Sequence, residues 1–277
     1  MPQEKDIQVF QLNWDNLMFA NKDYLKFIEE SKDKKLDIVI TSVVETNGST
    51  YAKVGNMMLV NSNNEFRGVL GSGFLQNKII ESSKEAMISK KTLYFESIPA
   101  DESSGHGNSK FKIEPFFYEN SYDNISKYIK KPYSILIFGS GAHVTSFISM
   151  ANLMAWKTTI IDIKINKNYV NEADNFIEVA NLEDILSMDL NSYNAAIILS
   201  HNPKTDNTYL KALINSNIQY IGMMGNKKNM QRITEEFNLN NDKRFYAPIG
   251  LNIGGNTHQA IALSICAQIE AKKNGKI

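Results

Sequence analysis

The sequence predicts an α/β protein that has an N-terminal α+β domain and a C-terminal Rossmann-like domain built on a doubly wound parallel sheet. Beyond residue 131, apolar runs typical of buried strands alternate with helical patterns. A Gly-x-Gly turn at Gly139 and Gly141 follows the first of these strands, and Asp162 ends the next strand about 20 positions later. We expect domains over residues 1–130 and 131–277, because the segment around 120–132 is polar and ends in Lys-Pro.

The N-terminal domain is expected to open with an amphipathic helix over residues 16–33. The polar residues 61–64 lie between two apolar runs and predict a hairpin. A helix is expected over 75–90, and a polar loop over 99–109. The predicted strands of this domain cover residues 37–45, 57–60, 66–70, 92–98 and 111–118.

In the C-terminal domain the final long helix is expected to begin after Asn256, with Gln259 completing a capping box. The alternation of strands and helices indicates a parallel sheet with helices on both faces. The predicted strands cover residues 135–138, 158–163, 195–199 and 220–224, and the earlier helices cover 144–156, 204–215 and 228–237.

The composition excludes several classes of protein. Lysine plus arginine equals aspartate plus glutamate, 30 against 30, so no overall charge favours nucleic acid or an acidic membrane. The sequence has no signal peptide and no apolar run of about 18 residues, so we expect a cytoplasmic protein without a membrane partner. Cys266 is the only cysteine and is expected to pack as a small apolar residue. Four scattered histidines predict no metal site.

Glycines recur at the ends of predicted strands, where their backbone N–H groups can approach a phosphate. Lys227 and Lys228 open a predicted helix and add positive charge beside one of these turns. Another interpretation is that each glycine only closes a loop. The glycines in question are Gly71, Gly73, Gly139, Gly141, Gly222 and Gly225.

The unit around Gly139 is also typical of a dinucleotide site, in which Asp162 would accept hydrogen bonds from a ribose. Val144 stands where that pattern has a third glycine, and would crowd a pyrophosphate. An NAD(P)-dependent oxidoreductase is therefore one hypothesis, with NAD favoured over NADP because the Asp162 carboxylate repels a 2′-phosphate.

His201 follows an apolar strand and should lie at the carboxyl edge of the sheet, where open α/β sheets bind ligands. His143 could face the same crevice. No nucleophile and base pair is evident, so no catalytic residue is assigned and a binding protein is favoured over an enzyme.

Five motifs occur in order along most of the chain, over residues 43–57, 68–76, 137–143, 220–228 and 247–265. Together they resemble the XdhC/CoxI family of molybdoenzyme accessory proteins. The resemblance implies binding of the molybdenum cofactor (molybdopterin), support of its sulfuration, and its insertion into an enzyme of the xanthine dehydrogenase type. It also implies a cytoplasmic homodimer.

The chain departs from the family pattern at positions that carry chemistry. Phe74 replaces a cysteine, Gln76 an acid and Ser72 a glycine, and asparagines stand at positions 108, 202 and 252. These changes remove thiolate ligands and acid/base groups but keep hydrogen-bonding shape.

The leading hypothesis is therefore a non-catalytic accessory or chaperone protein that binds the cofactor, or a related phosphorylated ligand, between the two domains. A scaffold that binds only a partner enzyme is the remaining alternative. Changing Gly139 and Gly141 together to valine is expected to abolish binding and leave the fold intact. The expected ligand-binding residues are Gly71, Gly73, Gly139, Gly141, Asp162, His201, Gly222, Gly225, Lys227 and Lys228.

Overall fold

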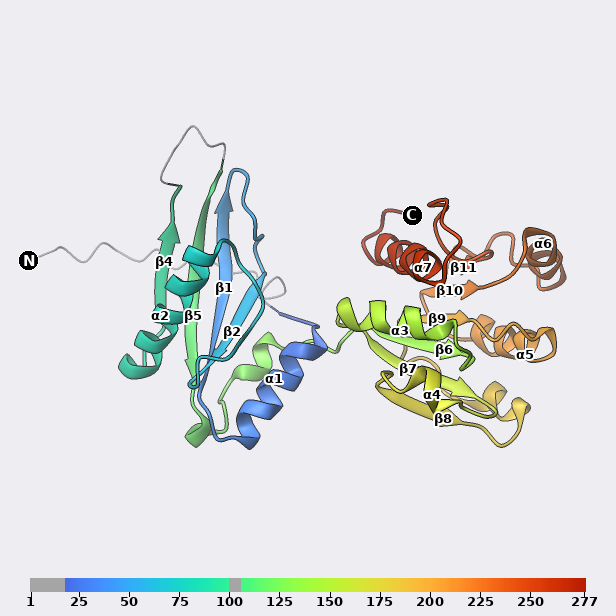
Figure 1. The fold of residues 1–277 in the computed structure, drawn as a ribbon, viewed down its shortest axis with the longest axis horizontal. Helices are drawn as coiled ribbons and strands as arrows, with labels where there is room; N and C mark the ends of the chain where they lie inside the picture. Colours follow the sequence, from blue (N-terminus) through green and yellow to red (C-terminus); the bar gives the residue numbers. More distant parts are fainter. Residues whose placement is uncertain (1–17, 100–105) are drawn as a thin grey trace, which may run out of the picture. The chain divides into compact units, whose positions relative to one another are not determined.

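The structure is a computed structural model that describes residues 18–99 and 106–277. It divides into two compact units, with the border between Lys131 and Pro132. The first two residues of the helix predicted over 16–33, and residues 100–105 of the loop predicted over 99–109, lie outside the described residues. Each unit is described by itself (Figure 1).

The first unit contains a five-stranded antiparallel sheet in the order β3-β2-β1-β5-β4. The predicted hairpin at 61–64 is confirmed, because Val60 pairs with Phe66 across β2 and β3. The strands are β1 (Ile38–Asn47), β2 (Met57–Asn61), β3 (Phe66–Arg67), β4 (Leu93–Ser97) and β5 (Asn108–Phe116).

Both faces of this sheet are covered, which explains why the first six residues of β1 are all buried. Ile38 and Ile40 pack with Phe27 of helix α1 (Lys22–Asp33). Val43, from the other face, packs with Ile79 of helix α2 (Gly73–Ser89). Two short 3₁₀ helices follow the sheet, η3 (Tyr118–Asn120) and η4 (Ile125–Tyr128).

A buried ionic cluster joins β5 to η4 in the first unit. The Glu114 carboxylate accepts hydrogen bonds from Nζ of Lys112 and of Lys127, each at 2.6 Å, and from the Tyr128 hydroxyl. Burial alone would raise the pKa of Glu114, but these hydrogen bonds outweigh it and lower the pKa. The cluster therefore holds a charged carboxylate in the interior.

The second unit contains a six-stranded sheet in the order β11-β10-β9-β6-β7-β8, and every neighbouring pair is parallel. Counted along this unit, the order is 3-2-1-4-5-6, which is that of a Rossmann fold. The predicted parallel sheet is thus confirmed. The strands are β6 (Ser134–Phe138), β7 (Lys157–Asp162), β8 (Asn175–Glu178), β9 (Ala195–Ile198), β10 (Tyr220–Met223) and β11 (Phe245–Tyr246).

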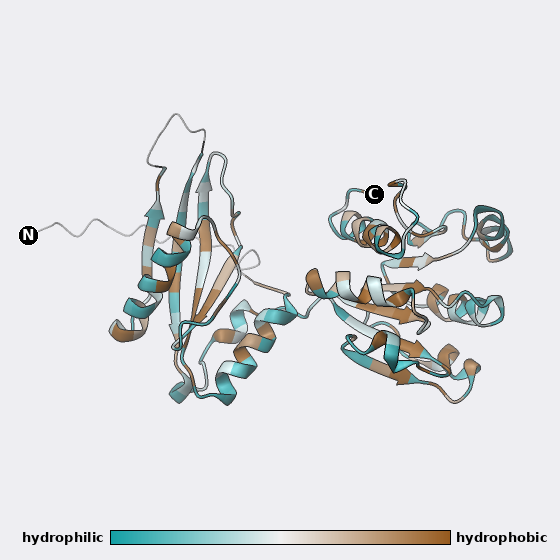
Figure 2. Cartoon of the chain, in the orientation of Figure 1, coloured by the Kyte–Doolittle hydropathy of each residue, from teal (hydrophilic) through white to brown (hydrophobic). Residues whose placement is uncertain are grey.

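Helices cover both faces of this sheet, as a doubly wound fold requires. Ile137 on one face packs with Phe147 and Ile265, and Leu136 on the other face packs with Leu210 and Met230. The two central strands, β6 and β9, are apolar over nearly their whole length (Figure 2). The helices are α3 (Val144–Leu153), α4 (Lys167–Val170), η5 (Leu182–Ser187), α5 (Pro203–Ile214), α6 (Lys227–Glu236) and α7 (His258–Lys273).

Two local predictions concern α7. The cap was expected at Asn256 with Gln259, but Thr257 is the cap and accepts a hydrogen bond from the Ala260 N–H at 3.2 Å. That prediction was wrong by one residue. Cys266 is buried in the core between α3 and α7, as expected, and burial raises the pKa of its thiol to about 12.

Within the described ranges, no helix combines the length and the hydrophobicity needed to cross a membrane. Over the same ranges, no group of three or more His, Cys, Asp or Glu side chains is arranged to hold a metal ion.

Candidate functional site

The strand order of the parallel sheet reverses between β6 and β9. Rossmann folds bind their ligands at the carboxyl ends of the strands beside this switch point. The loop after β6 and the loop after β9 meet closely at this switch point. Gly139 has φ +108°, and a Cβ placed there would lie 2.8 Å from Cα and 2.9 Å from N of Ser200. Only glycine fits both this backbone conformation and this approach. The expectation that Gly139 can become valine without loss of the fold is therefore not supported.

The side chain of His143 spans the two loops. Its Nε2 lies 2.6 Å from the carbonyl oxygen of Leu199. A carbonyl only accepts, so Nε2 carries the proton and donates. The imidazole also meets the ring of His201 edge to face, with 4.7 Å between centroids. Burial lowers the pKa of His143, and this outweighs the opposing effect of the Leu199 carbonyl, so the ring favours its neutral form.

The His143 ring also lies over the second glycine of the motif. A Cβ on Gly141 would be 2.8 Å from Cε1 and 3.0 Å from Nδ1 of that ring. Val144, at the position of the third glycine, is fully buried in the core of this unit. The space beside Gly141, where a dinucleotide fold receives a pyrophosphate, is therefore taken by the chain's own imidazole.

Asp162, at the end of β7, is held in place by two donors. The hydroxyl of Ser140, the middle residue of Gly-Ser-Gly, donates to Oδ2 at 2.9 Å. The N–H of Ile163 donates to Oδ1 at 2.8 Å. The Asn166 N–H in turn donates to the Ser140 oxygen at 3.2 Å. The predicted ribose-binding carboxylate thus lies at the carboxyl edge in a fixed orientation.

The loop after β9 contains a second buried acid. The Ser200 hydroxyl donates to the carboxylate of Asp206, whose side chain is only 5% exposed. Burial raises the pKa of Asp206 against the lowering effect of that hydrogen bond. His201 has φ +54°, an uncommon conformation for a residue other than glycine. Asn202 caps α5 by accepting a hydrogen bond from the Lys204 N–H at 3.2 Å.

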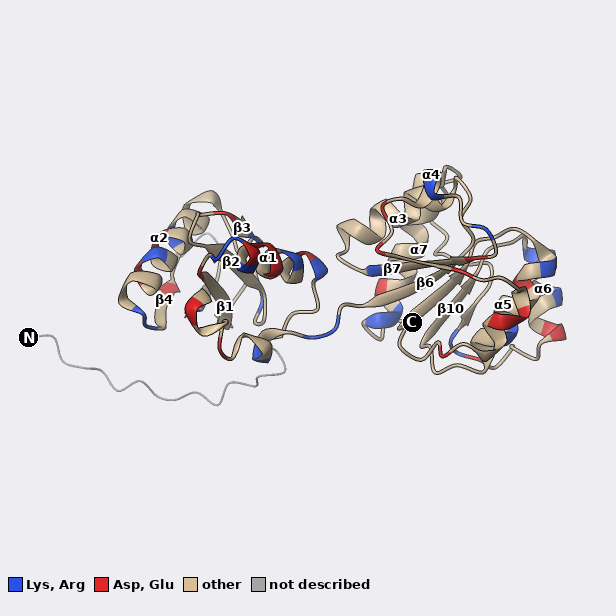
Figure 3. Cartoon of the chain, turned by 90° about the horizontal axis from the view of Figure 1, so that it is seen from below, with Lys and Arg blue, Asp and Glu red and all other residues tan. Residues whose placement is uncertain are grey.

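A pocket of about 280 Å³ lies between the N-terminal ends of α5 and α6. Asn226, which caps α6 by accepting from the Asn229 N–H at 2.9 Å, lines it together with Gly225. Lys227 and Lys228 are exposed in the first turn of α6, and Figure 3 shows basic residues on this helix. Helix N-termini and lysines favour an anion, while the buried carboxyl can accept from a ligand hydroxyl or amine. The remaining lining residues are His201, Pro203, Asp206, Met224 and Asn229.

The predicted residues fall in four places. Gly139, Gly141, Asp162 and His201 lie at the switch point, and Gly225, Lys227 and Lys228 lie at the start of α6. Gly222 instead lies inside β10, where a Cβ would be 2.2 Å from Cδ1 of Ile249, so its glycine identity is explained by packing. Gly71 and Gly73 belong to the first unit, at the start of α2.

Sequence reasoning assigned no role to Ser140, Ser200, Asp206 or Asn226. Three of them could have been found from local patterns. Ser140 is the middle residue of the glycine motif, Asn226 precedes a predicted helix as a cap should, and Asp206 lies one turn after the cap Asn202. Ser200 offered no such signal, because its hydrogen bond to Asp206 depends on the path of the loop after β9.

A complete 3-2-1-4-5-6 parallel sheet with a glycine loop at its switch point defines a Rossmann-type domain. The chain belongs to the XdhC and CoxI family: residues 135–269 match the XdhC Rossmann domain and residues 33–96 match the XdhC and CoxI family.

Two curated relatives are similar to this chain. It is 25% identical over 260 residues to the uncharacterized protein YqeB of Escherichia coli (strain K12), covering 90% of this chain and 46% of that protein. It is 23% identical over 158 residues to a probable xanthine dehydrogenase subunit of Bacillus subtilis (strain 168), covering 56% and 47% respectively. The chain thus spans about half the length of the curated relatives it matches.

A solved structure shares the fold. The crystal structure of a xanthine dehydrogenase from Bacillus halodurans superimposes with a TM-score of 0.75 at 17% identity, covering 91% of this chain and 96% of that one.

Proposed function

We propose that this protein is an accessory protein in the maturation of a molybdoenzyme of the xanthine dehydrogenase type, and that it binds the molybdenum cofactor or a related phosphorylated ligand. Family membership supports the accessory role. The observation that carries the binding proposal is the pocket between the N-termini of α5 and α6, with Lys227 and Lys228 in the first turn of α6.

The residues around this pocket suit the organic part of such a ligand. The first-turn N–H groups of α6, with Lys227, would hold a phosphate. Asp206 would accept hydrogen bonds from an amino or ring N–H group, which a pterin offers. When bound, the cofactor carries the metal and dithiolene chemistry that its client enzyme uses, so here it is cargo.

Binding without turnover is the favoured activity. Asn202 and Asn252 stand where the family pattern has carboxylates, so both positions keep hydrogen-bonding capacity without transferring protons. His143 is engaged with the Leu199 carbonyl. We also propose a cytoplasmic homodimer, as the family resemblance implies, and domains over residues 1–130 and 131–277, as the polar segment around 120–132 indicates.

An NAD(P)-dependent oxidoreductase is the second candidate. The Rossmann strand order and the placement of Asp162 at the carboxyl edge favour it. The position of His143 over Gly141 and the buried Val144 oppose it, because both occupy space that the dinucleotide pattern keeps open.

The test begins with protein purified from cells that make molybdenum cofactor. The protein is denatured, the released material is oxidised, and pterin fluorescence is measured alongside mass spectrometry for nucleotides. We expect stoichiometric pterin in the wild type. A double variant, Lys227→Ala with Lys228→Ala, should retain roughly tenfold less, since each lysine contributes a charge-assisted contact.

The matched control is Lys84→Ala with Lys91→Ala, two exposed lysines of the first unit that change the charge equally. The control should keep the wild-type amount of pterin. A nucleotide without pterin would replace the proposal with the oxidoreductase. If the purified protein holds no ligand and does not bind the cofactor in a direct titration, the binding proposal is rejected in favour of a scaffold that binds only a partner enzyme.

A further inference from the structure

The first unit has a cavity of its own, of about 450 Å³, at the start of α2. It lies against the sheet face that α2 covers. Three stretches of chain line it: the loop 49–52, Gly71 with Ser72, and the neighbouring ends of β4 and β5. None of these stretches contributes to the pocket described in the second unit.

The walls of this cavity are built by close backbone contacts. The Gly107 N–H donates to the Ser49 carbonyl oxygen at 2.6 Å. A Cβ on Gly107 would lie 1.9 Å from the carbonyl oxygen of Asn47, so these two backbone segments touch without room for a side chain. Thr50 closes its own turn by donating from Oγ1 to the Ala52 carbonyl at 2.8 Å. The cavity is therefore a formed feature of the fold.

Ser109 is the observation that points to a ligand. It pairs with Ser97 across β4 and β5, two residues beyond the stacked rings of Phe95 and Phe111 on the α2 face. Its side chain is only 8% exposed and lines the cavity. Among the described residues, its hydroxyl has no hydrogen-bond partner, and because it is not one of their fully buried polar atoms it opens into the cavity. The cavity thus offers a hydroxyl that the fold leaves unused.

The N-terminus of α2 opens beside this hydroxyl. α2 has 17 residues, so its first turn has a substantial positive dipole end. Ser72 caps it weakly, with 3.5 Å between its Oγ and the Leu75 nitrogen. Beside Gly73, a Cβ would meet nothing within 4 Å. First-turn N–H groups point out of a helix end, and Gly71 and Ser72 at that end line the cavity.

The lining also indicates the class of ligand. In the part of the chain that the structure describes, no Asp, Glu, Lys or Arg lines the cavity, so its recognition would use hydroxyls, N–H groups and the imidazole of His106. These groups suit a phosphate, as helix N-termini do elsewhere. The volume exceeds that of a bare ion and lies in the range of small-molecule sites. Tyr51, 77% exposed, lines the cavity and offers a ring to a planar group.

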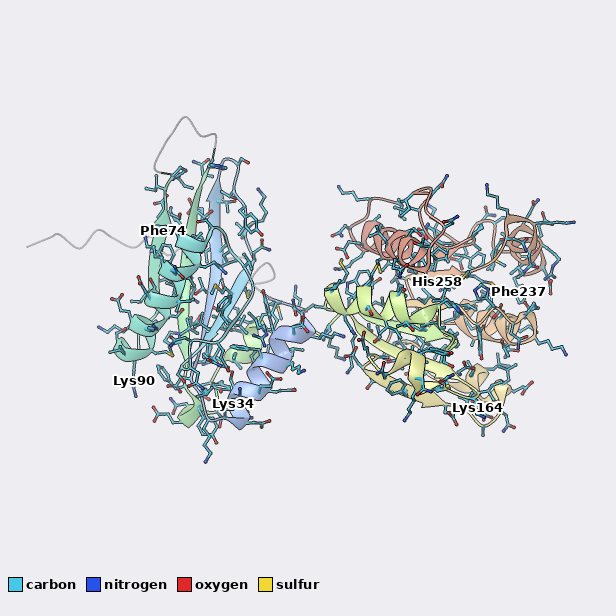
Figure 4. The ribbon with its side chains drawn as sticks, in the orientation of Figure 1. Lys34, Phe74, Lys90, Lys164, Phe237 and His258 are labelled. Carbon is cyan, nitrogen blue, oxygen red and sulfur yellow. The ribbon has the colours of Figure 1, made fainter. Side chains whose placement is uncertain are left out.

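We propose that this cavity binds a phosphate monoester of a small organic molecule, with the phosphate between Ser109 and the start of α2 and the organic part against Tyr51. Phe74, 82% exposed in the first turn of α2, adds a second aromatic ring at the same end of the helix (Figure 4). This proposal does not rest on the site proposed in the second unit.

The test titrates the whole protein with phenyl phosphate and follows backbone amides by two-dimensional NMR. Gly71 and Gly73 amide signals should shift in a saturable manner. Ser109→Ala removes a donor that makes no other bond, and should weaken binding roughly tenfold, as expected for a hydrogen bond to a charged acceptor. Ser89→Ala, at the far end of α2, is the control and should bind as the wild type does.

A second pair of variants isolates the helix end. Proline is tolerated at the first position of a helix but lacks an N–H, and Ser72 already has the extended backbone that precedes proline (φ −64°, ψ 163°). Gly73→Pro should therefore weaken binding several-fold, whereas Gly73→Ala, which keeps the N–H, should not. Gly73→Ala and Gly73→Pro both leave the helix start intact. A loss of binding in Gly73→Pro alone would therefore show that the N–H of residue 73 donates to the ligand.

Two further ligands test whether the site recognises the organic ring or only the phosphate group. Glycerol phosphate and inorganic phosphate should bind more weakly than phenyl phosphate, because neither carries a ring for Tyr51. If inorganic phosphate binds as well as phenyl phosphate, the site takes a free oxyanion and the assigned role of Tyr51 is wrong. If shifts are absent, or are equal in wild type, Ser109→Ala and Gly73→Pro, the proposed site is overturned. None of these outcomes depends on the pterin measurement.

Discussion

The hydrogen bond from His143 Nε2 to the Leu199 carbonyl oxygen, 2.6 Å long, joins the loop after β6 to the end of β9 at the switch point of the sheet. The same ring covers Gly141 and contacts His201. One side chain thus determines both the contact between the two loops and the space left beside the glycine motif.

Acidification should destabilise the fold at His143, because the protonated ring still donates to Leu199 but its charge is costly to bury. Burial holds the pKa of His143 below its usual value of about 6.5, so below that pH the unfolded chain binds the proton more readily than the folded one. The stabilisation from neutral His143 is fully present above pH 6.5 and is lost as the pH falls through the folded pKa. Urea unfolding at several pH values between about 5 and 8 measures this slope.

His143→Gln provides the matched comparison, because its amide Nε2–H can still reach a carbonyl but does not titrate. We expect the pH slope to decrease in this variant and stability at pH 7.5 to fall by less than in His143→Ala, for which about 1 kcal/mol is expected. An unchanged slope in His143→Gln would show that another group dominates.

The two glycines of the motif should respond differently to alanine. Gly139→Ala places a methyl group against the backbone of Ser200 at a positive φ, so we expect a loss of about 3 kcal/mol or failure to fold. Gly141→Ala meets only the His143 ring, which can rotate, and should cost about 1 kcal/mol. Thermal unfolding of both variants measures these two losses of stability. Equal losses would contradict the close contact assigned to Gly139 at the switch point.

The buried cluster around Glu114 should matter far more than an exposed ion pair. Glu114→Gln removes the carboxylate that accepts from Lys112, Lys127 and Tyr128, and should cost about 3 kcal/mol in unfolding free energy. Because the pKa of Glu114 is lowered in the fold, its contribution is present above about pH 4.5 and is lost as the pH falls through the folded pKa. Denaturant unfolding at pH 7 and pH 4 tests both statements.

The control for this cluster is Glu119→Gln, which breaks the exposed pair of Glu119 with Lys90, 3.2 Å apart. That change should cost less than about 0.5 kcal/mol. If both variants lose the same stability, burial does not distinguish the two carboxylates.

Cys266 should be chemically silent in the folded protein. Its thiol is buried and burial raises its pKa to about 12, so essentially no thiolate exists at pH 7.5. A thiol reagent such as Ellman's reagent should react only as fast as the chain opens, and at once after denaturation. Rapid labelling of the native protein would show that α7 separates readily from α3.

The strands with strong apolar character were predictable from the sequence, and β6, β7, β9 and β10 all lie within a residue or two of their expected ranges. β8 and β11 were not predicted. β8 has the sequence Asn-Phe-Ile-Glu and β11 only two residues, so neither has enough apolar residues to stand out. Both lie at the edges of the sheet, where pairing with a neighbouring strand, a tertiary effect, creates the strand.

The candidate site was predictable as a region but not in its contacts. The glycine motif, Asp162 and His201 were identified because strand ends and glycines are local signals. That His143 lies over Gly141, or that Ile249 explains Gly222, depends on residues brought together by the fold. At α7, Asn256 and Thr257 are both good caps, and the choice depends on where the preceding loop enters the helix.

The bond from Ser140 to Asp162 has a consequence for selectivity. A carboxylate held by Ser140 and the Ile163 N–H keeps only about two of its four lone-pair sites, in fixed directions, for an incoming hydroxyl, and a neutral hydrogen bond there gains little over water. A ligand hydroxyl in the wrong position would therefore lose its hydrogen bonds to water and form none with Asp162. One in the right position would exchange a hydrogen bond to water for one of about equal free energy. Asp162 would then reject mismatched molecules more strongly than it attracts the correct one.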